Sequence, residues 1–158
     1  MEITEIITGT KKKVTVSVVH DDDFRTLTKK RYFFNWKSLK EDALLYKLQI
    51  NGEKDILGII ALIDFPSESR IEIKLLASSR ENVGENKVYT GIAACLIAFA
   101  CREGVRKYAN MACVSLVPKT SLKQHYMRQY KMIDSGWQLF LEGKPLFDLI
   151  KKIYDANK

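Results

Sequence analysis

The chain has 158 residues, of which 46% are hydrophobic, enough for one globular domain with a single core; this excludes disordered and fibrous proteins. Eight Gly and three Pro exclude a collagen-like or linker-dominated chain, so we predict a single domain over residues 1–158. The 26 Lys and Arg outnumber the 19 Asp and Glu, and the net charge of +7 suits an anionic partner such as nucleic acid, an anionic membrane or a phosphorylated small molecule.

The N-terminal part predicts a strand followed by a helical stretch. Val14, Val16 and Val18 recur at every second position, the pattern of a half-buried strand. Three aspartates at residues 21–23 are suited to the N-terminus of a helix. Residues 24–40 then carry six Lys or Arg and no Asp or Glu, among many aromatic side chains.

The middle of the chain predicts three antiparallel strands and a loop. Apolar residues alternate over residues 44–50, Asn51-Gly52 is a short hairpin turn signal, and residues 56–65 resume as an apolar strand. Residues 71–75 alternate again as a third strand. Residues 78–87 are polar and predict a loop.

The C-terminal part predicts alternating helices and strands. The expected elements are a helix from Gly91 to about Arg102, a buried strand at residues 111–117, a helix capped by Ser121 and ending at Tyr130, a short strand at residues 137–141, and a helix from Pro145. This order predicts an α/β (α+β) chain with an antiparallel sheet first and a βαβ-type crossover later.

The cysteines and the N-terminus predict a cytoplasmic protein. Cys95, Cys101 and Cys113 are an odd number with no metal-binding spacing, so we expect buried, reduced thiols. The first ten residues lack the basic and apolar regions of a signal peptide, and the longest apolar run, residues 92–101, is about half of a membrane span. We therefore expect no metal and no membrane partner.

Residues 70–132 carry the most informative pattern. Gly91, Ala93 and Ala94 are small residues at the start of an apolar helix, where unpaired backbone amides and the helix dipole favour a phosphate. The run Val88-Tyr89-Thr90-Gly91-Ile92-Ala93 resembles the acetyl-CoA pyrophosphate loop of the GCN5-related N-acetyltransferase (GNAT) family, whose pattern is Gln/Arg-x-x-Gly-x-Gly/Ala. The Gly and the final Ala agree, Val88 replaces Gln or Arg, and Lys87 is the neighbouring cation.

This resemblance implies a fold and a cosubstrate. The fold is a GNAT-like mixed, mostly antiparallel central sheet flanked by helices, here with a C-terminal helix in place of the last strand. The cosubstrate is acetyl-CoA, the acetyl donor, without a metal. The implied cofactor-binding residues are Leu76, Ala77 and Ser78 for the pantetheine arm, with Lys87, Val88, Tyr89, Thr90, Gly91, Ile92, Ala93 and Ala94 for the pyrophosphate.

The resemblance also implies catalytic residues. Direct acetyl transfer needs a base for the amine proton and an acid for the departing thiolate. Tyr126 is the candidate acid, one residue away from the family's position. Glu72 lies where some members carry their base, and His125 is the third candidate. A solvated strand-face carboxylate for Glu72 and a surface or packing role for His125 stay open as alternatives.

Two basic segments have two interpretations each. The aromatic residues within 24–40 either cover the acceptor or pack in the core, while the lysines there bind an anionic acceptor or RNA, or are solvated. A second cluster meets either the CoA 3′-phosphate, which we favour, or a nucleic acid: Lys119, Lys123, Arg128 and Lys131.

The predicted function is that of an acetyl-CoA-dependent N-acetyltransferase acting on an unidentified amine. The alternatives are a non-catalytic acyl-CoA-binding or regulatory GNAT-fold module and an aminoacyl-tRNA acetyltransferase toxin. The predicted partners are acetyl-CoA and the amine. Nucleic acid is a further candidate that we do not favour, and the final helix is a candidate homodimer interface.

Overall fold

The computed structural model describes residues 1–155, apart from the side chain of Thr120. The chain divides into two compact units. Unit 1 comprises Met1–Ala61 and Leu75–Ile97, and unit 2 comprises Leu62–Lys74 and the chain from Ala98 onward. The single domain predicted from the sequence stays a prediction.

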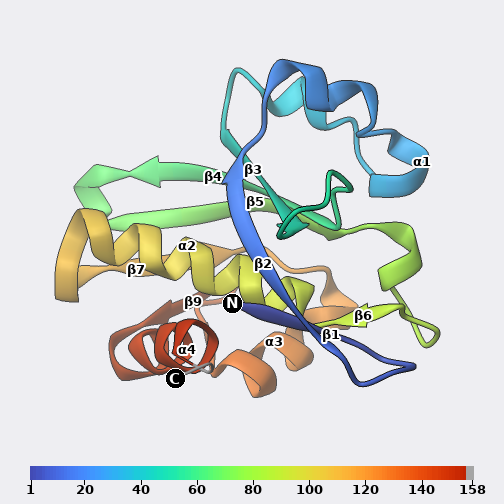
Figure 1. Ribbon diagram of the computed structural model, residues 1–158. Helices are drawn as coiled ribbons and strands as arrows, with labels where there is room; N and C mark the ends of the chain where they lie inside the picture. Colours follow the sequence, from blue (N-terminus) through green and yellow to red (C-terminus); the bar gives the residue numbers. More distant parts are fainter. Residues whose placement is uncertain (156–158) are drawn as a thin grey trace. The chain divides into compact units, whose positions relative to one another are not determined.

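Within the described residues, nine strands and four α-helices make up the mixed α+β fold that the sequence predicts. The strands are β1 (Glu2–Glu5), β2 (Lys11–Val18), β3 (Leu44–Ile50), β4 (Gly58–Phe65), β5 (Arg70–Ser78), β6 (Tyr89–Thr90), β7 (Cys113–Leu116), β8 (Ile133–Asp134) and β9 (Leu139–Glu142). The helices are α1 (Lys29–Tyr32), α2 (Ile92–Tyr108), α3 (Lys123–Tyr130) and α4 (Gly143–Tyr154). The strands pair in the order β6-β1-β2-β3-β4-β5-β7-β9-β8 (Figure 1).

The core of unit 1 forms where the aromatic segment after β2 packs on the strands. Tyr32 and Trp36 are completely buried in a cluster with apolar residues of β3, β4 and β5. The Tyr32 hydroxyl donates to the carbonyl of Ile56 at 2.8 Å, and Trp36 Nε1 donates to the carbonyl of Tyr32 at 2.9 Å. The core interpretation is therefore correct for these two aromatic side chains.

The single helical stretch expected after residue 20 is wrong in detail. Two 3-10 helices, η1 (Asp21–Arg25) and η2 (Trp36–Leu39), flank the short helix α1. Thr28 starts α1, because its hydroxyl accepts from the Arg31 amide, and Phe33 ends it in the left-handed conformation at φ 73°. A continuous amphipathic spacing cannot show these two interruptions.

The β-strands of unit 1 extend the predicted sheet. β1 was not predicted, and it pairs antiparallel with β2 and also with β6. Asn51 and Gly52 form a turn, but β4 begins only at Gly58, so the short hairpin expected there is a longer loop. Ile56 is buried without being part of a strand, which explains why its apolar run was assigned to β4.

Unit 2 holds the paired parts of β5 and β7, which are the parallel strands of the predicted crossover, and the C-terminal helix. β5 and β7 are parallel, with Arg70 opposite Cys113 and Ile73 opposite Leu116, and β7 is antiparallel to β9. The two-residue strand β8 was not predicted; it pairs with β9, and α4 follows β9 as the expected terminal helix.

Two helix boundaries in unit 2 differ from the predictions. α2 continues past its expected end near Gly104 to Tyr108, and Gly104 lies inside the helix, where an added Cβ would make an ordinary contact of 3.4 Å with Ala112 Cβ. α3 is preceded by the 3-10 helix η6 (Thr120–Leu122), and its N-cap is Leu122 rather than Ser121. Along the described residues, no helix is both long and apolar enough to cross a membrane.

Candidate functional site

The loop between β5 and α2, residues 79–91, carries five of the eleven candidate cofactor residues, those from Lys87 to Gly91. All eleven, from Leu76 to Ala94, lie in unit 1. Ala77 is buried in the core, whereas Leu76 and Ser78 are half-buried, as expected for alternating strand positions. Lys87 and Val88 are exposed.

Buried Asn82 shapes this β5–α2 loop. It belongs to the 3-10 helix η4 (Arg80–Asn82) and is 4% exposed. Its Nδ2 donates to Ser79 Oγ at 2.9 Å, and its Oδ1 accepts from the Tyr89 amide at 2.8 Å. The Val88 amide donates to the carbonyl of Glu81 at 3.2 Å. The amides of Val88 and Tyr89 are therefore engaged within the loop itself.

Gly91 and the first turn of α2 present the remaining amides. Gly91 has φ 102°, and its carbonyl accepts the first helical hydrogen bond from the Cys95 amide at 3.0 Å. The three amides between them, of Ile92, Ala93 and Ala94, have no partner four residues earlier in the helix. An added Cβ at Gly91 would stay 3.8 Å from Glu2 and Ile3, so the conformation, and not lack of space, calls for glycine here.

Gly58 of β4 sets the position of that first turn. A Cβ added to Gly58 would lie 2.6 Å from Ile92 Cγ2 and 3.0 Å from Leu96 Cδ1, which is closer than side chains pack. The helix can approach β4 this closely because residue 58 has no side chain. This role was not predicted from the sequence, although an isolated Gly in an apolar strand run signals a close approach.

An acidic environment surrounds Tyr89. Burial first, and then Glu5, Glu53 and Asp55, raise the pKa of the Tyr89 hydroxyl. Glu5 lies opposite Tyr89 in the β1–β6 pair. Carboxylates therefore lie close to the strand that precedes Gly91.

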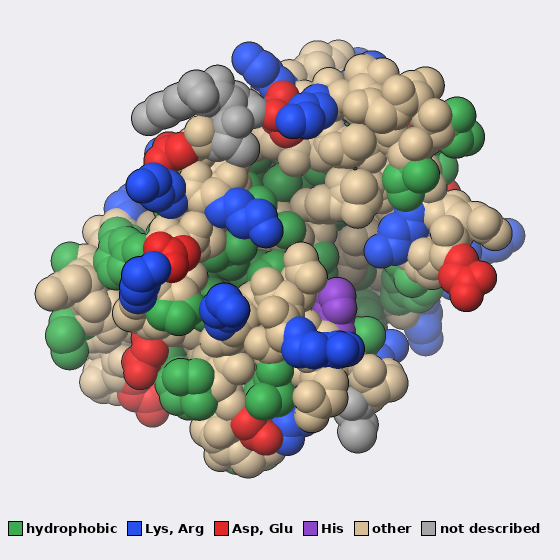
Figure 2. Space-filling view, turned by 90° about the horizontal axis from the view of Figure 1, so that it is seen from below, with side chains coloured by type: hydrophobic (Ala, Val, Ile, Leu, Met, Phe, Trp, Pro, Cys, Tyr) green, Lys and Arg blue, Asp and Glu red, His purple; other side chains and the backbone are tan. Residues whose placement is uncertain are grey.

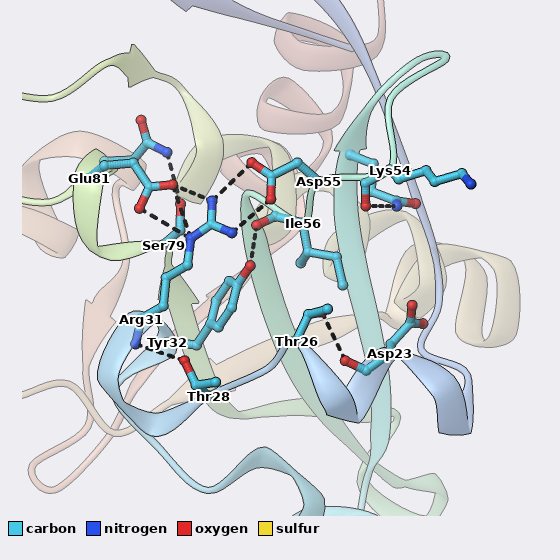
Figure 3. A network of polar contacts seen from close by, with 12 residues as sticks. Asp23, Thr26, Thr28, Arg31, Tyr32, Lys54, Asp55, Ile56, Ser79 and Glu81 are labelled. Carbon is cyan, nitrogen blue, oxygen red and sulfur yellow. Dashed lines mark hydrogen bonds and ion pairs between the residues drawn. The ribbon is translucent and has the colours of Figure 1, made fainter.

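Arg31 of α1, whose role was not predicted from the sequence, offsets part of this acidic charge (Figure 3). Its Nη1 and Nη2 donate to the two carboxylate oxygens of Asp55 at 2.7 and 2.9 Å, and its Nε donates to Glu81 at 3.2 Å. Nη2 also bonds Glu81. These bonds raise the pKa of Arg31, and the bond from Arg31 lowers the pKa of Glu81. The guanidinium of Arg31 is therefore engaged in hydrogen bonds within the chain, to Asp55 and Glu81.

The catalytic candidates lie in unit 2. The His125 and Tyr126 rings meet edge to face with centroids 5.8 Å apart, and both rings also contact that of Tyr130, at 6.4 and 5.9 Å. Burial raises the pKa of Tyr126, while His125 is exposed. Sequence adjacency on a helix did not require these two rings to meet.

Glu72 lies in a different set of contacts. Its carboxylate is 3.5 Å from Arg70 Nη1, which also donates to Ser115 Oγ at 2.7 Å. The Arg70 guanidinium covers the Phe65 ring at 4.2 Å and bonds Glu68 through Nε at 2.6 Å. Glu72 is thus a half-buried carboxylate paired with a cation, rather than a freely solvated one.

The cysteines behave as small apolar residues. Cys95 and Cys101 are buried and Cys113 is half-buried, all three with free thiols. Burial raises the pKa of Cys95 and of Cys113 to about 11, so these thiols stay protonated at neutral pH. Among the residues that the structure describes, no cluster of His, Cys, Asp or Glu could hold a metal ion.

Comparisons with known proteins identify the fold. No protein-family model and no curated protein sequence matches the chain. Among solved structures, a putative acetyltransferase from T. thermophilus matches with a TM-score of 0.67 and 8% identity, over 92% of this chain and 94% of that one. A point mutant of the spermidine N-acetyltransferase of Vibrio cholerae matches with a TM-score of 0.59 and 11% identity, over 92% and 98%.

Two further matches are complexes. A Bacillus subtilis acetyltransferase in complex with CoA matches with a TM-score of 0.51 and 14% identity, over 83% of this chain and 98% of that one. AtaT complexed with acetyl-methionyl-tRNAfMet matches with a TM-score of 0.57 and 16% identity, over 87% and 99%. These likenesses confirm the GNAT fold that the sequence pattern implied.

Proposed function

We propose that this protein is an acetyl-CoA-dependent N-acetyltransferase that transfers the acetyl group directly to an amine. The observation that carries the proposal is the start of α2, where Gly91 and the amides of residues 92–94 follow β5 and its loop in a GNAT fold. We also propose the cytoplasm as its location, because all three cysteines are free thiols.

The residues at this helix start fit a pyrophosphate. The first turn of α2 contains no acidic residue, and Ala93 and Ala94 have side chains too small to cover their amides. With the Val88 and Tyr89 amides engaged inside the loop, the amides from Gly91 to Ala94 are those proposed to bind the anion. Val88 occupies the position at which the family pattern has Gln or Arg. Exposed Lys87, the preceding residue, is proposed to supply the positive charge in its place.

The strand before the loop is proposed to hold the pantetheine arm. Leu76, Ala77 and Ser78 follow the part of β5 that pairs with β7, since the register ends with Ile73 opposite Leu116, the last residue of β7. We propose that, beyond the last of these pairs, backbone groups of β5 bind the extended arm of the ligand. Bound acetyl-CoA supplies the acetyl group, and the chain supplies its binding and the proton transfers.

Three side chains are proposed for the proton transfers. Tyr126, whose pKa is raised by burial, stays protonated at neutral pH and is suited to give a proton to the departing thiolate. An ammonium group must lose a proton before it attacks, and Glu72 and His125 are the candidate bases. Glu72 is half-buried beside Arg70, and His125 is exposed, so the two candidates differ in their surroundings.

Titration calorimetry with acetyl-CoA tests the donor site. We expect binding to the wild-type protein and its loss in Gly91→Glu, which places a negative charge against the pyrophosphate. Gly52→Glu is the matched control, because Gly52 also has positive φ, at 85°, but lies in the exposed β3–β4 turn. Absence of binding to the wild-type protein contradicts the proposal. CoA release with an amine panel then distinguishes an enzyme from a non-catalytic acyl-CoA-binding module.

A second candidate function is acetylation of an amine carried by RNA. Residues 104–133 contain six Lys or Arg and no Asp or Glu, and Lys119, Arg128 and Lys131 are exposed. Figure 2 shows a face on which Lys and Arg side chains outnumber Asp and Glu. The match to AtaT, complexed with acetyl-methionyl-tRNAfMet, favours the same chemistry.

Salt dependence of RNA binding tests this candidate. We expect fluorescence anisotropy with labelled tRNA to give an affinity that falls steeply with salt, and Arg128→Gln with Lys131→Gln to reduce that slope. Lys144→Gln is the control, because Lys144 is already paired with Asp148 at 2.6 Å. Affinity that is absent or independent of salt removes RNA from consideration.

A further inference from the structure

We propose that Arg31 is a positioning residue for the acetyl-CoA loop: it ties α1 to η4 and so fixes the backbone that leads into Gly91. This inference rests on the proposed function, in which the β5–α2 loop binds acetyl-CoA. Arg31 itself is not proposed to touch that ligand, since its guanidinium is filled by Asp55 and Glu81.

Arg31 joins three segments of unit 1 that are distant in sequence. Its own segment is α1, Asp55 belongs to the β3–β4 loop, and Glu81 belongs to η4 (Figure 3). Asp55 receives two parallel N–H bonds at 2.7 and 2.9 Å, a geometry that only a guanidinium supplies. A lysine at this position keeps the positive charge but cannot make the two parallel N–H bonds to Asp55.

The next links run from η4 to the end of the loop. Glu81 accepts from the Val88 amide through its carbonyl, while its carboxylate holds Arg31. Asn82, the next residue, accepts from the Tyr89 amide. Gly91 lies two residues after Tyr89. A displacement of η4 is therefore passed to the start of α2 through the hydrogen bonds of Glu81 with Val88 and of Asn82 with Tyr89.

A second contact makes the tie between α1 and η4 stiff. Arg80 Nε donates to the carbonyl of Lys30 at 2.7 Å, and its guanidinium covers the Phe33 ring at 4.7 Å. Phe33 is in the left-handed conformation that ends α1. Arg80 and Glu81, neighbours in η4, therefore hold three positions of the α1 segment: Lys30, Arg31 and Phe33.

Charge gives Arg31 a second reason to affect an anionic ligand. Asp55 is one of the carboxylates that raise the pKa of Tyr89 beside the loop end, together with Glu5 and Glu53. Arg31 offsets Asp55 and Glu81. Without it, the loop that is proposed to bind a pyrophosphate lies in a more negative field.

Hydrogen exchange tests the tie without any ligand. We expect Arg31→Gln to speed exchange of the Val88 and Tyr89 amides, which are hydrogen-bonded in the loop. Lys47→Gln is the matched control: it breaks the Lys47–Asp23 pair, at 2.7 Å and more buried than the Arg31 pairs, elsewhere in unit 1. Unchanged exchange at both amides in Arg31→Gln overturns the proposal.

Calorimetry with acetyl-CoA tests the consequence for binding. We expect Kd to rise about tenfold in Arg31→Gln and by less in Arg31→Lys, which keeps the charge, with Kd unchanged in Lys47→Gln. Equal Kd in wild type and Arg31→Gln overturns the proposal. If Arg31→Gln does not fold, Glu81→Gln breaks the same tie from its other side. Because this substitution also removes a negative charge beside the loop, its expected readout is faster exchange of the Val88 and Tyr89 amides, and unchanged exchange there overturns the proposal.

The two proposals fail in different ways. If the wild-type protein does not bind acetyl-CoA, the proposed function fails, and the exchange measurement still decides whether Arg31 positions the loop. Once an acceptor is known, the KM for acetyl-CoA should rise in Arg31→Gln while kcat at saturating acetyl-CoA stays within about twofold. A fall in kcat with unchanged KM contradicts a positioning role.

Discussion

Tyr126 and Gly91 show what a residue's surroundings add to its position in the sequence. A short sequence pattern predicted Tyr126 as the acid and Gly91 as part of the pyrophosphate loop. Neither prediction used the contacts that these residues make in the folded protein. Burial raises the pKa of Tyr126, and its ring meets His125 and Tyr130. Gly91 has a positive φ of 102°.

The contacts of Arg31 could not be predicted, because Asp55 and Glu81 are distant from it in the sequence. Gly58 carried a local signal of a close approach, but not the identity of its partner Ile92. Asn82 bonds Ser79 and Tyr89, three and seven residues away, and no residue pattern indicates these bonds.

The first prediction concerns Tyr126. We expect Tyr126→Phe to lower kcat by about a hundredfold or more with little change in the KM for acetyl-CoA, because phenylalanine keeps the ring contacts and loses the proton. Steady-state kinetics on an acceptor from the amine panel measure this. Tyr130→Phe, in the same ring cluster, is the control, and equal kcat in Tyr126→Phe and wild type would exclude Tyr126 as the acid.

The pH profile gives an independent check on Tyr126. Because its pKa is raised above 10.0, the hydroxyl stays protonated throughout the neutral and mildly alkaline range. We therefore expect no loss of kcat from deprotonation of this acid between pH 7 and 9. A decline in that interval in wild type that is absent in Tyr126→Phe contradicts the raised pKa.

At the scale of elements, period and composition predicted the longer strands and helices. β2, β3, β4, β5 and α2 were all expected, because each buries a long enough apolar pattern to be read locally. β1, β6 and β8 are two to four residues long and owe their existence to a neighbouring strand. The break between η1, α1 and η2 depends on the Thr28 cap and on Phe33, which interrupt a helical pattern without changing it.

Two glycines provide a matched test of helix packing. Gly58→Ala should destabilise the protein by about 1–3 kcal/mol, because its Cβ would meet Ile92 at 2.6 Å. Gly104→Ala should be neutral or stabilise it by up to about 1 kcal/mol, because α2 gains a helix former and the nearest contact is an ordinary 3.4 Å. Chemical denaturation measures both.

The same pair separates packing from ligand binding. Ile92 is the first residue of α2, so displacement of that turn in Gly58→Ala should also weaken acetyl-CoA binding. Gly104 lies in unit 2, and its substitution should leave the affinity unchanged. Stability that falls equally in the two variants would mean that Gly58 does not provide a close approach.

At the scale of the whole molecule, charge pairs in both units link stability to pH. In unit 1 the bond from Arg31 lowers the pKa of Glu81, and in unit 2 the bond from Lys123 lowers the pKa of Asp134. A carboxyl whose pKa is lower in the folded state contributes stability at neutral pH and loses it as pH falls through that pKa. Burial raises the pKa of Tyr32 to about 12, and stability from this group is lost as pH rises from 10.0 toward that value.

We therefore expect a Tm that is highest between about pH 5 and 9 and falls on both sides. Glu81→Gln should make the acid side of the curve shallower, and Tyr32→Phe should do the same on the alkaline side. Differential scanning calorimetry across this range is the measurement. A Tm in Glu81→Gln that depends on acid as strongly as in wild type would show that its pairing with Arg31 contributes nothing to stability.

The β5–α2 loop has a consequence for proteolysis. Residues 83–88 are exposed on both sides of Gly84, and Lys87 among them is a trypsin site, whereas Arg80 is held against Phe33 and Lys30. A cut after Lys87 leaves Asn82 and Tyr89 on different fragments that are joined by a hydrogen bond. The rate of cleavage after Lys87, followed by mass spectrometry of the fragments with and without acetyl-CoA, therefore reports the state of the loop in unlabelled protein.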